Sequence, residues 1–162
     1  MRRSPTLYAF LALALASVSS VPAQATHPDF SGTWLLDSAK SQAPTLPASS
    51  TLSVTQSDKL LTIEQTSSSA MGSRTTKLVY HIDGSPSKNT FPAPGGGSID
   101  FNSNVEWSGQ TLVITTTADL NGGFKQVERW TVSDAGKQLV VNGDIAVSGQ
   151  SATAKMVYTK KS

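Results

Sequence analysis

The feature that most constrains the fold is the alternation of apolar and polar residues in short runs along most of the chain. In one run, Leu78, Tyr80 and Ile82 fall on the same face of an extended segment. This period of two is typical of half-buried β-strands. Turn-forming pairs such as Asp83-Gly84 separate the runs at short intervals, and no stretch has a convincing helical period. The pattern predicts an all-β fold, a single antiparallel up-and-down β-barrel of about 8–10 strands.

The first of these runs, residues 29–37, carries the largest side chain of the N-terminal region. Phe30, Gly32, Trp34 and Leu36 share one face of an extended strand. A glycine two residues before a tryptophan allows close approach of another chain segment, while the indole fills much of a small core. We therefore expect Gly32 and Trp34 to close one end of the barrel.

Further strands follow at regular spacing. They are expected at residues 52–56, 60–66, 75–83, 99–107, 112–118, 124–133, 139–147 and 152–158. Residues 38–50 contain two prolines and read as a loop or one short helical turn, and Gly143 is expected to form a bulge or bend. Residues 85–98 form the longest irregular segment, with room for a short edge strand around 89–91.

The N-terminus has the three parts of a secretory signal peptide. A basic start at Arg2 and Arg3 precedes a short apolar run at 7–16, and residues 23–25 read A-x-A. The predicted domains are a signal peptide at 1–25 and a β-barrel domain at 26–162. The apolar run is shorter than the roughly 20 residues that cross a bilayer, so we expect a periplasmic or secreted protein without stable membrane insertion.

Composition excludes several classes of function. The chain has no cysteine, which rules out disulfides and thiolate metal sites. Loss of Arg2 and Arg3 would leave basic and acidic residues in balance, so no nucleic-acid footprint is expected. His27 and His81 are the two histidines and lie in a tail and on a polar strand face. We expect no metal, no cofactor and no catalytic residues, and therefore not an enzyme.

Large rings on apolar faces are the first candidates for ligand contact. They are Tyr80, Phe101, Trp107, Trp130 and Tyr158. Each ring is also explained by ordinary core packing, but five of them in one small barrel make an aromatic-lined cavity plausible.

The residue pattern of the strand at 124–133 does not decide which of its two faces points into the barrel. If the face of Trp130 points inward, Glu128 and Gln126 are the polar groups best able to orient a ligand. If it points outward, Arg129 and Lys125 take that role.

The string Phe30-Ser31-Gly32-Thr33-Trp34-Leu35-Leu36 resembles the opening strand of fatty-acid-binding proteins, within the calycin superfamily that includes lipocalins. The closing run 157–160 is also similar, as is the layout of bacterial exported lipocalin-like proteins. The resemblance implies a ligand-binding barrel over residues 29–160. It also implies an arginine packed over Trp34. Of Arg74 and Arg129 we expect Arg129, because it lies on a regular late strand.

The chain departs from fatty-acid-binding proteins at two points. Those proteins place an arginine for the ligand carboxylate where this chain has Met156, and Lys155 points to the opposite face. Residues 38–50 also have too many helix breakers for a helical lid. A fatty-acid carboxylate clamp therefore does not carry over.

Two functions remain open from the sequence. The first is an exported barrel that binds a small, largely apolar ligand without chemistry. The alternative is a protein-interaction or inhibitor module with a filled interior, which would contact its protein partner through the 85–98 loop.

Overall fold

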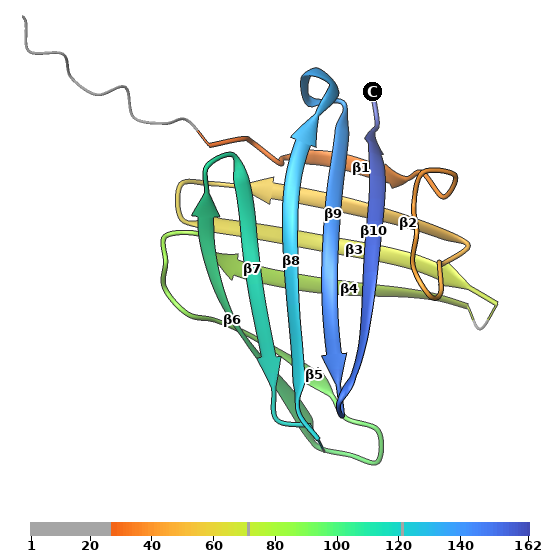
Figure 1. The fold of residues 1–162 in the computed structure, drawn as a ribbon, viewed down its shortest axis with the longest axis vertical. Helices are drawn as coiled ribbons and strands as arrows, with labels where there is room; N and C mark the ends of the chain where they lie inside the picture. The colour runs from red at the N-terminus through yellow and green to blue at the C-terminus, as the bar shows by residue number, and fades with distance from the viewer. Residues whose placement is uncertain (1–26, 71, 121) are drawn as a thin grey trace, which may run out of the picture.

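The computed structural model describes residues 27–70, 72–120 and 122–162. They form one ten-stranded antiparallel sheet that curls into a nearly closed barrel (Figure 1). The strands are β1 (Gly32–Leu36), β2 (Ser49–Gln56), β3 (Leu60–Ser69), β4 (Gly72–His81), β5 (Ser87–Pro92), β6 (Ser98–Ser108), β7 (Thr111–Ala118), β8 (Phe124–Ser133), β9 (Gln138–Val147) and β10 (Gln150–Lys160). The predicted fold class is confirmed, and the predicted signal peptide lies outside the described residues.

Each strand pairs with its neighbours in the chain, except that β4 and β5 do not pair with each other. In addition β1 pairs with β10, which brings the N-terminal and C-terminal strands together. The sheet edges are β4 and β5. They meet without a backbone ladder, and side chains of β5 bridge the seam instead. The Asn89 amide accepts a hydrogen bond from the Val79 N–H at 2.9 Å and donates one to the Val79 carbonyl at 3.1 Å. The His81 N–H donates to the Ser87 hydroxyl at 2.7 Å.

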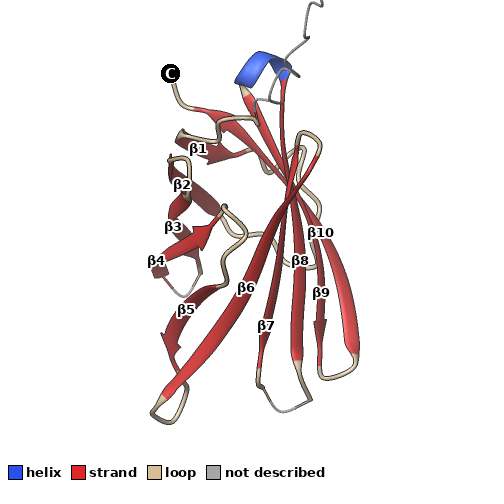
Figure 2. Cartoon of the chain, turned by 90° about the vertical axis from the view of Figure 1, so that its left-hand side faces the viewer, coloured by secondary structure: helices blue, strands red, loops and turns tan. Residues whose placement is uncertain are grey.

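The two ends of the barrel differ in packing. The short 3-10 helix η1 (Asp134–Gly136) lies at the upper end in Figure 2, and the β5–β6 and β9–β10 turns lie at the lower end. Inward side chains of the upper half are buried, with Phe30, Trp34, Leu112 and Leu139 fully so. We call this half the closed end and the lower one the mouth.

The β1–β2 connection contains no helix among its residues, as the breakers in 38–50 predicted. It runs along β10 instead. The buried Ser41 hydroxyl accepts a hydrogen bond from the Val157 N–H at 2.9 Å, and Gln42 bridges to Lys155. This segment therefore extends the sheet edge rather than forming a helical lid.

Two local predictions have different outcomes. The edge strand expected around 89–91 is present as β5, with Pro92 at its last position, where a missing N–H costs little. The bulge expected at Gly143 is absent, because β9 keeps an unbroken register with both β8 and β10 through this residue. The prediction failed because a glycine inside a strand does not always mark a bulge. It can also occupy a regular strand position where no side chain is present.

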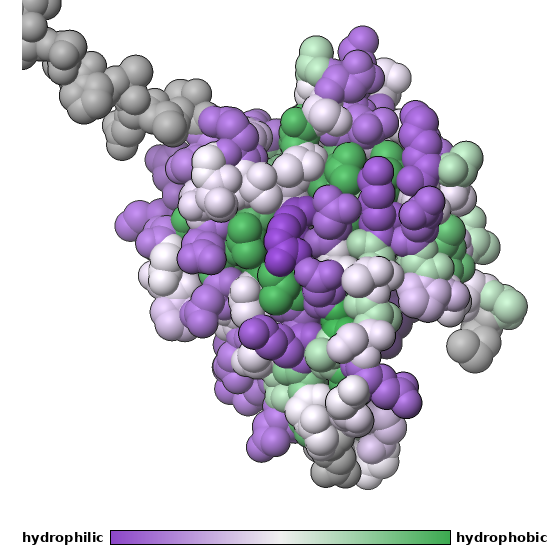
Figure 3. Space-filling view, in the orientation of Figure 1, coloured by the Kyte–Doolittle hydropathy of each residue, from purple (hydrophilic) through white to green (hydrophobic). Residues whose placement is uncertain are grey.

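The outer surface mixes hydrophilic and apolar residues on the face shown in Figure 3. Within the described ranges, no helix is long and apolar enough to cross a membrane.

Candidate functional site

Trp34 lies at the closed end of the barrel. Its side chain is fully buried, and its indole N–H donates to the Phe30 carbonyl at 2.8 Å. The cation against this ring is Lys160, whose Nζ lies 5.1 Å from the ring centroid. Gly32 has a φ of 131° and lies beneath Lys160, where an added Cβ would come within 2.7 Å of the lysine Cε.

Arg129 does not occupy the position over Trp34 that the resemblance implied. It lies on the outer face of β8, where its guanidinium contacts the Asp144 carboxylate at 2.7 Å. The strand alternation that turns Trp130 inward necessarily turns Arg129 outward. Lys160 lies on β10, the strand that pairs with β1, and is the last residue of the closing run 157–160.

Trp107 and Trp130 both belong to the closed end. Trp107 stacks between His27, at 4.0 Å between ring centroids, and Phe30, at 6.0 Å. It is half-buried, so it is a rim residue rather than part of a central site. Trp130 is buried and meets Phe30 edge to face at 5.9 Å. Its indole N–H points toward the middle of the barrel and donates to the Glu128 carboxylate at 3.4 Å.

The open question about strand β8 is resolved by its burial. Trp130 is buried and the alternating Gln126 and Glu128 are half-buried, while Lys125 and Arg129 are exposed. Glu128 thus faces the interior. Its carboxylate accepts a hydrogen bond from the Gln126 amide at 2.8 Å as well as the one from Trp130. Burial raises the pKa of Glu128 above the ordinary glutamate value, and these two hydrogen bonds oppose the shift.

Two tyrosines converge on this carboxylate from other parts of the barrel. Tyr80 on β4 and Tyr158 on β10 are both buried, and the pKa of each is raised by burial and by the negative charge of Glu128. Thr116 beside Tyr80 and Ser50 beside Tyr158 act in the opposite direction and lower the pKa of these phenols. The sequence-predicted residues Tyr80, Glu128, Trp130 and Tyr158 therefore lie around one interior region.

Small hydroxyl and amide side chains extend this region toward the mouth. The Ser103 and Thr116 hydroxyls, both buried, lie 2.8 Å apart. Ser50, also buried, accepts a hydrogen bond from the Gln65 amide at 3.3 Å. We call the set Ser50, Tyr80, Ser103, Thr116, Gln126, Glu128 and Tyr158 the interior polar cluster. It has a polar, hydrogen-bonding lining where a solid barrel core would be apolar.

Phe101 lies nearer the mouth than this cluster. Its ring is edge to face with Phe91 at 5.5 Å and with Phe124 at 5.3 Å. These three rings are only half-buried although they share the inward face, and the same holds for Ile145 on β9. Solvent therefore reaches the inward wall of the mouth. Phe101 thus belongs to an accessible apolar wall, at a different level of the barrel from Trp107.

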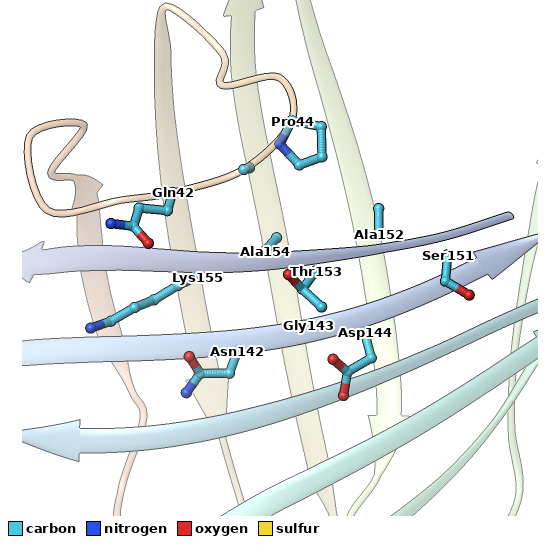
Figure 4. Close-up of a pocket in the computed structure, with 11 residues that line it drawn as sticks. Gln42, Pro44, Asn142, Gly143, Asp144, Ser151, Ala152, Thr153, Ala154 and Lys155 are labelled. Carbon is cyan, nitrogen blue, oxygen red and sulfur yellow. The ribbon is translucent and has the colours of Figure 1, made fainter.

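A second opening lies beside the free edge of β10 (Figure 4). A groove of about 610 Å³ separates the segment around Pro44 from the strand. Its lining combines outward residues such as Asn142 with the inward positions Gly143 and Ala154. The groove therefore straddles the edge of the sheet rather than lying on one face.

The described residues bring together no group of three or more histidine, aspartate or glutamate side chains able to hold a metal ion. His27 stacks on Trp107, and His81 lies on the outward face of β4. What the interior polar cluster offers is a carboxylate, phenols, hydroxyls and an amide, which are groups that bind and orient a molecule.

No protein-family model and no curated protein sequence matches the chain. Solved structures do match it in fold, and the predicted resemblance to calycin-type lipid-binding barrels is confirmed at that level. Lipid binding protein 8 of Caenorhabditis elegans, without ligand, aligns with a TM-score of 0.57 and 15% identity over 82% of this chain and 95% of that one.

Two other barrels have the same arrangement. The zebrafish ileal bile acid-binding protein, in complex with cholic acid, aligns with a TM-score of 0.54 and 16% identity over 82% of this chain and 98% of that one. A secretory abundant heat soluble protein of Ramazzottius varieornatus aligns with a TM-score of 0.54 and 10% identity over 86% and 100%. At these identities the likeness establishes the fold alone.

Sequence reasoning missed Lys160 and the hydroxyl members of the cluster. The sequence analysis did not single out Ser50, Ser103 or Thr116, because serine and threonine fit both faces of a strand. Their position on the strands could have identified them. Ser103 and Thr116 each fall on the alternating face that also carries large apolar residues, where a polar group needs a partner.

Proposed function

We propose that the protein is an exported, non-catalytic barrel that binds a small, largely apolar ligand in its interior. The observation that carries the proposal is the interior polar cluster beneath an accessible wall of half-buried rings. Binding sites for small molecules are mostly apolar, with a few polar groups that fix the orientation of the ligand.

The fold comparisons support binding at a general level. Two of the similar structures are named as a lipid-binding and a bile acid-binding protein, and the chain spans nearly all of each. Export to the periplasm or the medium rests on the N-terminal pattern of residues 1–25. Mass measurement of the exported protein tests it, with Thr26 expected as the first residue.

Binding is tested by titrating the purified protein with N-phenyl-1-naphthylamine, an uncharged apolar fluorophore. Saturable fluorescence enhancement, competed by material extracted from the protein isolated from its own host, is the expected result. A protein that never enhances the dye and carries no extractable small molecule contradicts the proposal. That outcome would favour the interaction module, which keeps a filled interior.

A pair of matched variants shows where on the protein the dye binds. Phe101→Ser makes the mouth wall polar without touching the closed end and should weaken dye binding. Leu35→Ser changes an exposed residue on the outer face of β1 and should leave it unchanged. Equal effects of the two variants would mean that the dye binds elsewhere.

A further inference from the structure

Glu128 places a carboxylate inside the barrel without a cationic partner among the described residues. The ion pairs found there involve Asp37, Asp100 and Asp144, each with an exposed lysine or arginine. Every lysine and arginine side chain in the described ranges lies in an exposed residue, while Glu128 faces inward. A carboxylate withdrawn from water without a counter-ion is unfavourable, and a bound cation relieves that cost.

The sheet leaves room directly beside this carboxylate. In the register, Glu128 lies opposite Gly143 on β9, which in turn lies opposite Ala154 on β10. Gly143 is buried, yet a Cβ added to it would meet no heavy atom within 4 Å. The inward face next to Glu128 is therefore a recess formed by a missing and a small side chain.

The carboxylate also keeps unused hydrogen-bonding capacity. Gln126 donates to one oxygen and Trp130 to the other, whereas a carboxylate accepts about four hydrogen bonds. Tyr80 and Tyr158 add their rings and hydroxyls around the same region. Protonated amines satisfy such a setting, because they donate several hydrogen bonds to a carboxylate and are attracted to aromatic faces.

We propose that this interior site selects a ligand with a protonated amine on an apolar tail, and that it discriminates against carboxylate-bearing lipids. The amine lies in the recess against Glu128, and the tail runs toward the mouth past Phe101 and Phe124. The inward Met156 supplies no positive charge, and a ligand carboxylate would be repelled by Glu128. This inference rests on the proposed function and specifies its ligand class.

The test compares three probes with one tail: decylamine, decanol and decanoate. Each displaces N-phenyl-1-naphthylamine from the wild-type protein at about pH 7, where the amine and the acid are both charged. Decylamine is expected to bind roughly tenfold or more tighter than decanol, since hydrogen bonds to charged groups are about twice as strong as neutral ones. Decanoate is expected to bind weakest.

Two interior variants and one control locate the effect. Glu128→Gln keeps the shape and removes the charge, so it should abolish the advantage of decylamine over decanol. Gly143→Leu fills the recess and should weaken all probes. Glu106→Gln removes an exposed carboxylate from the outer face of β6 and should leave the order of the three probes intact. Far-UV circular dichroism confirms that each variant is folded.

The outcomes separate the two proposals. If the dye binds but decanoate matches decylamine, or if Glu128→Gln keeps the preference for decylamine, the amine assignment is overturned while ligand binding stands. If neither dye nor decyl probe binds to the folded wild-type protein, the binding function itself fails and the assignment falls with it.

Discussion

Truncating Trp34 should unfold the protein far more easily, because this indole closes one end of the barrel. Its side chain has no exposed surface, and its N–H satisfies the buried Phe30 carbonyl at 2.8 Å. Large aromatic-to-alanine changes in such sites cost about 3–5 kcal/mol, and the unsatisfied carbonyl puts Trp34→Ala in the upper part of that range. With a total stability of roughly 5–15 kcal/mol, a large fraction is lost.

Urea denaturation followed by circular dichroism measures this loss. With a slope of about 2 kcal/mol per molar urea, a 4 kcal/mol loss lowers the midpoint by about 2 M. Trp130→Ala should have a comparable effect, because that ring is also buried. Trp107→Ala should cost only about 2 kcal/mol, since a half-exposed ring leaves a smaller cavity.

The comparison among the three tryptophans carries the argument. A Trp34→Ala midpoint within about 0.5 M of the Trp107→Ala midpoint would refute the reasoning, given typical slopes. It would mean that Trp34 is a rim residue and that the barrel end is closed by other groups. Trp34→Phe serves as a control, because it keeps most of the ring volume and loses the hydrogen bond, for an expected cost of about 1–2 kcal/mol.

Three further predictions concern the seam, the first strand and the interior charge. Asn89→Leu should cost about 2 kcal/mol and speed hydrogen exchange of the Val79 amide, since both backbone groups of Val79 lose a partner; unchanged exchange would contradict this. Gly32→Ala should cost about 1–2 kcal/mol by urea denaturation, because its φ of 131° disfavours any side chain; a neutral effect would show that the strand start relaxes. The raised pKa of Glu128 means that stability is gained when it is protonated and is lost as pH rises through the folded-state pKa. Glu128→Gln should therefore be more stable than wild type near pH 7, with the difference shrinking near pH 4, and a pH-independent difference would contradict the assignment.

Much of the fold followed from the sequence because strand alternation is a local property. Period two alone predicted the face shared by Phe30, Gly32 and Trp34. It also predicted the last strand, which the structure extends to Lys160. The inward direction of Glu128 was not, since β8 carries apolar and polar residues on both faces. Only the neighbouring strands, which place Ile114 and Gly143 opposite it, decide which face is inside.

Contacts between distant strands lay beyond local reasoning. The pairing of β1 with β10 brings Lys160 to Trp34 across more than a hundred residues, and no sequence pattern selects it over Arg129. The seam is similar. Asn89 was read as part of a short edge strand, but its role in bridging to Val79 depends on barrel closure, which aligns two strands without a backbone ladder.

Stability alone explains the residues in one half of the interior but not those in the other. At the closed end, every inward group contributes apolar burial or a satisfied hydrogen bond, and folding explains the residues found there. Around Glu128 the opposite holds: no described residue supplies a counter-ion for this interior carboxylate, and the facing Gly143 leaves space that a larger apolar side chain would fill with gain in stability. Packing does not account for that combination. The proposed ligand would complete this combination of interior charge and space beneath an accessible aromatic wall. The gain in stability expected for Glu128→Gln then measures what this carboxylate costs the folded protein.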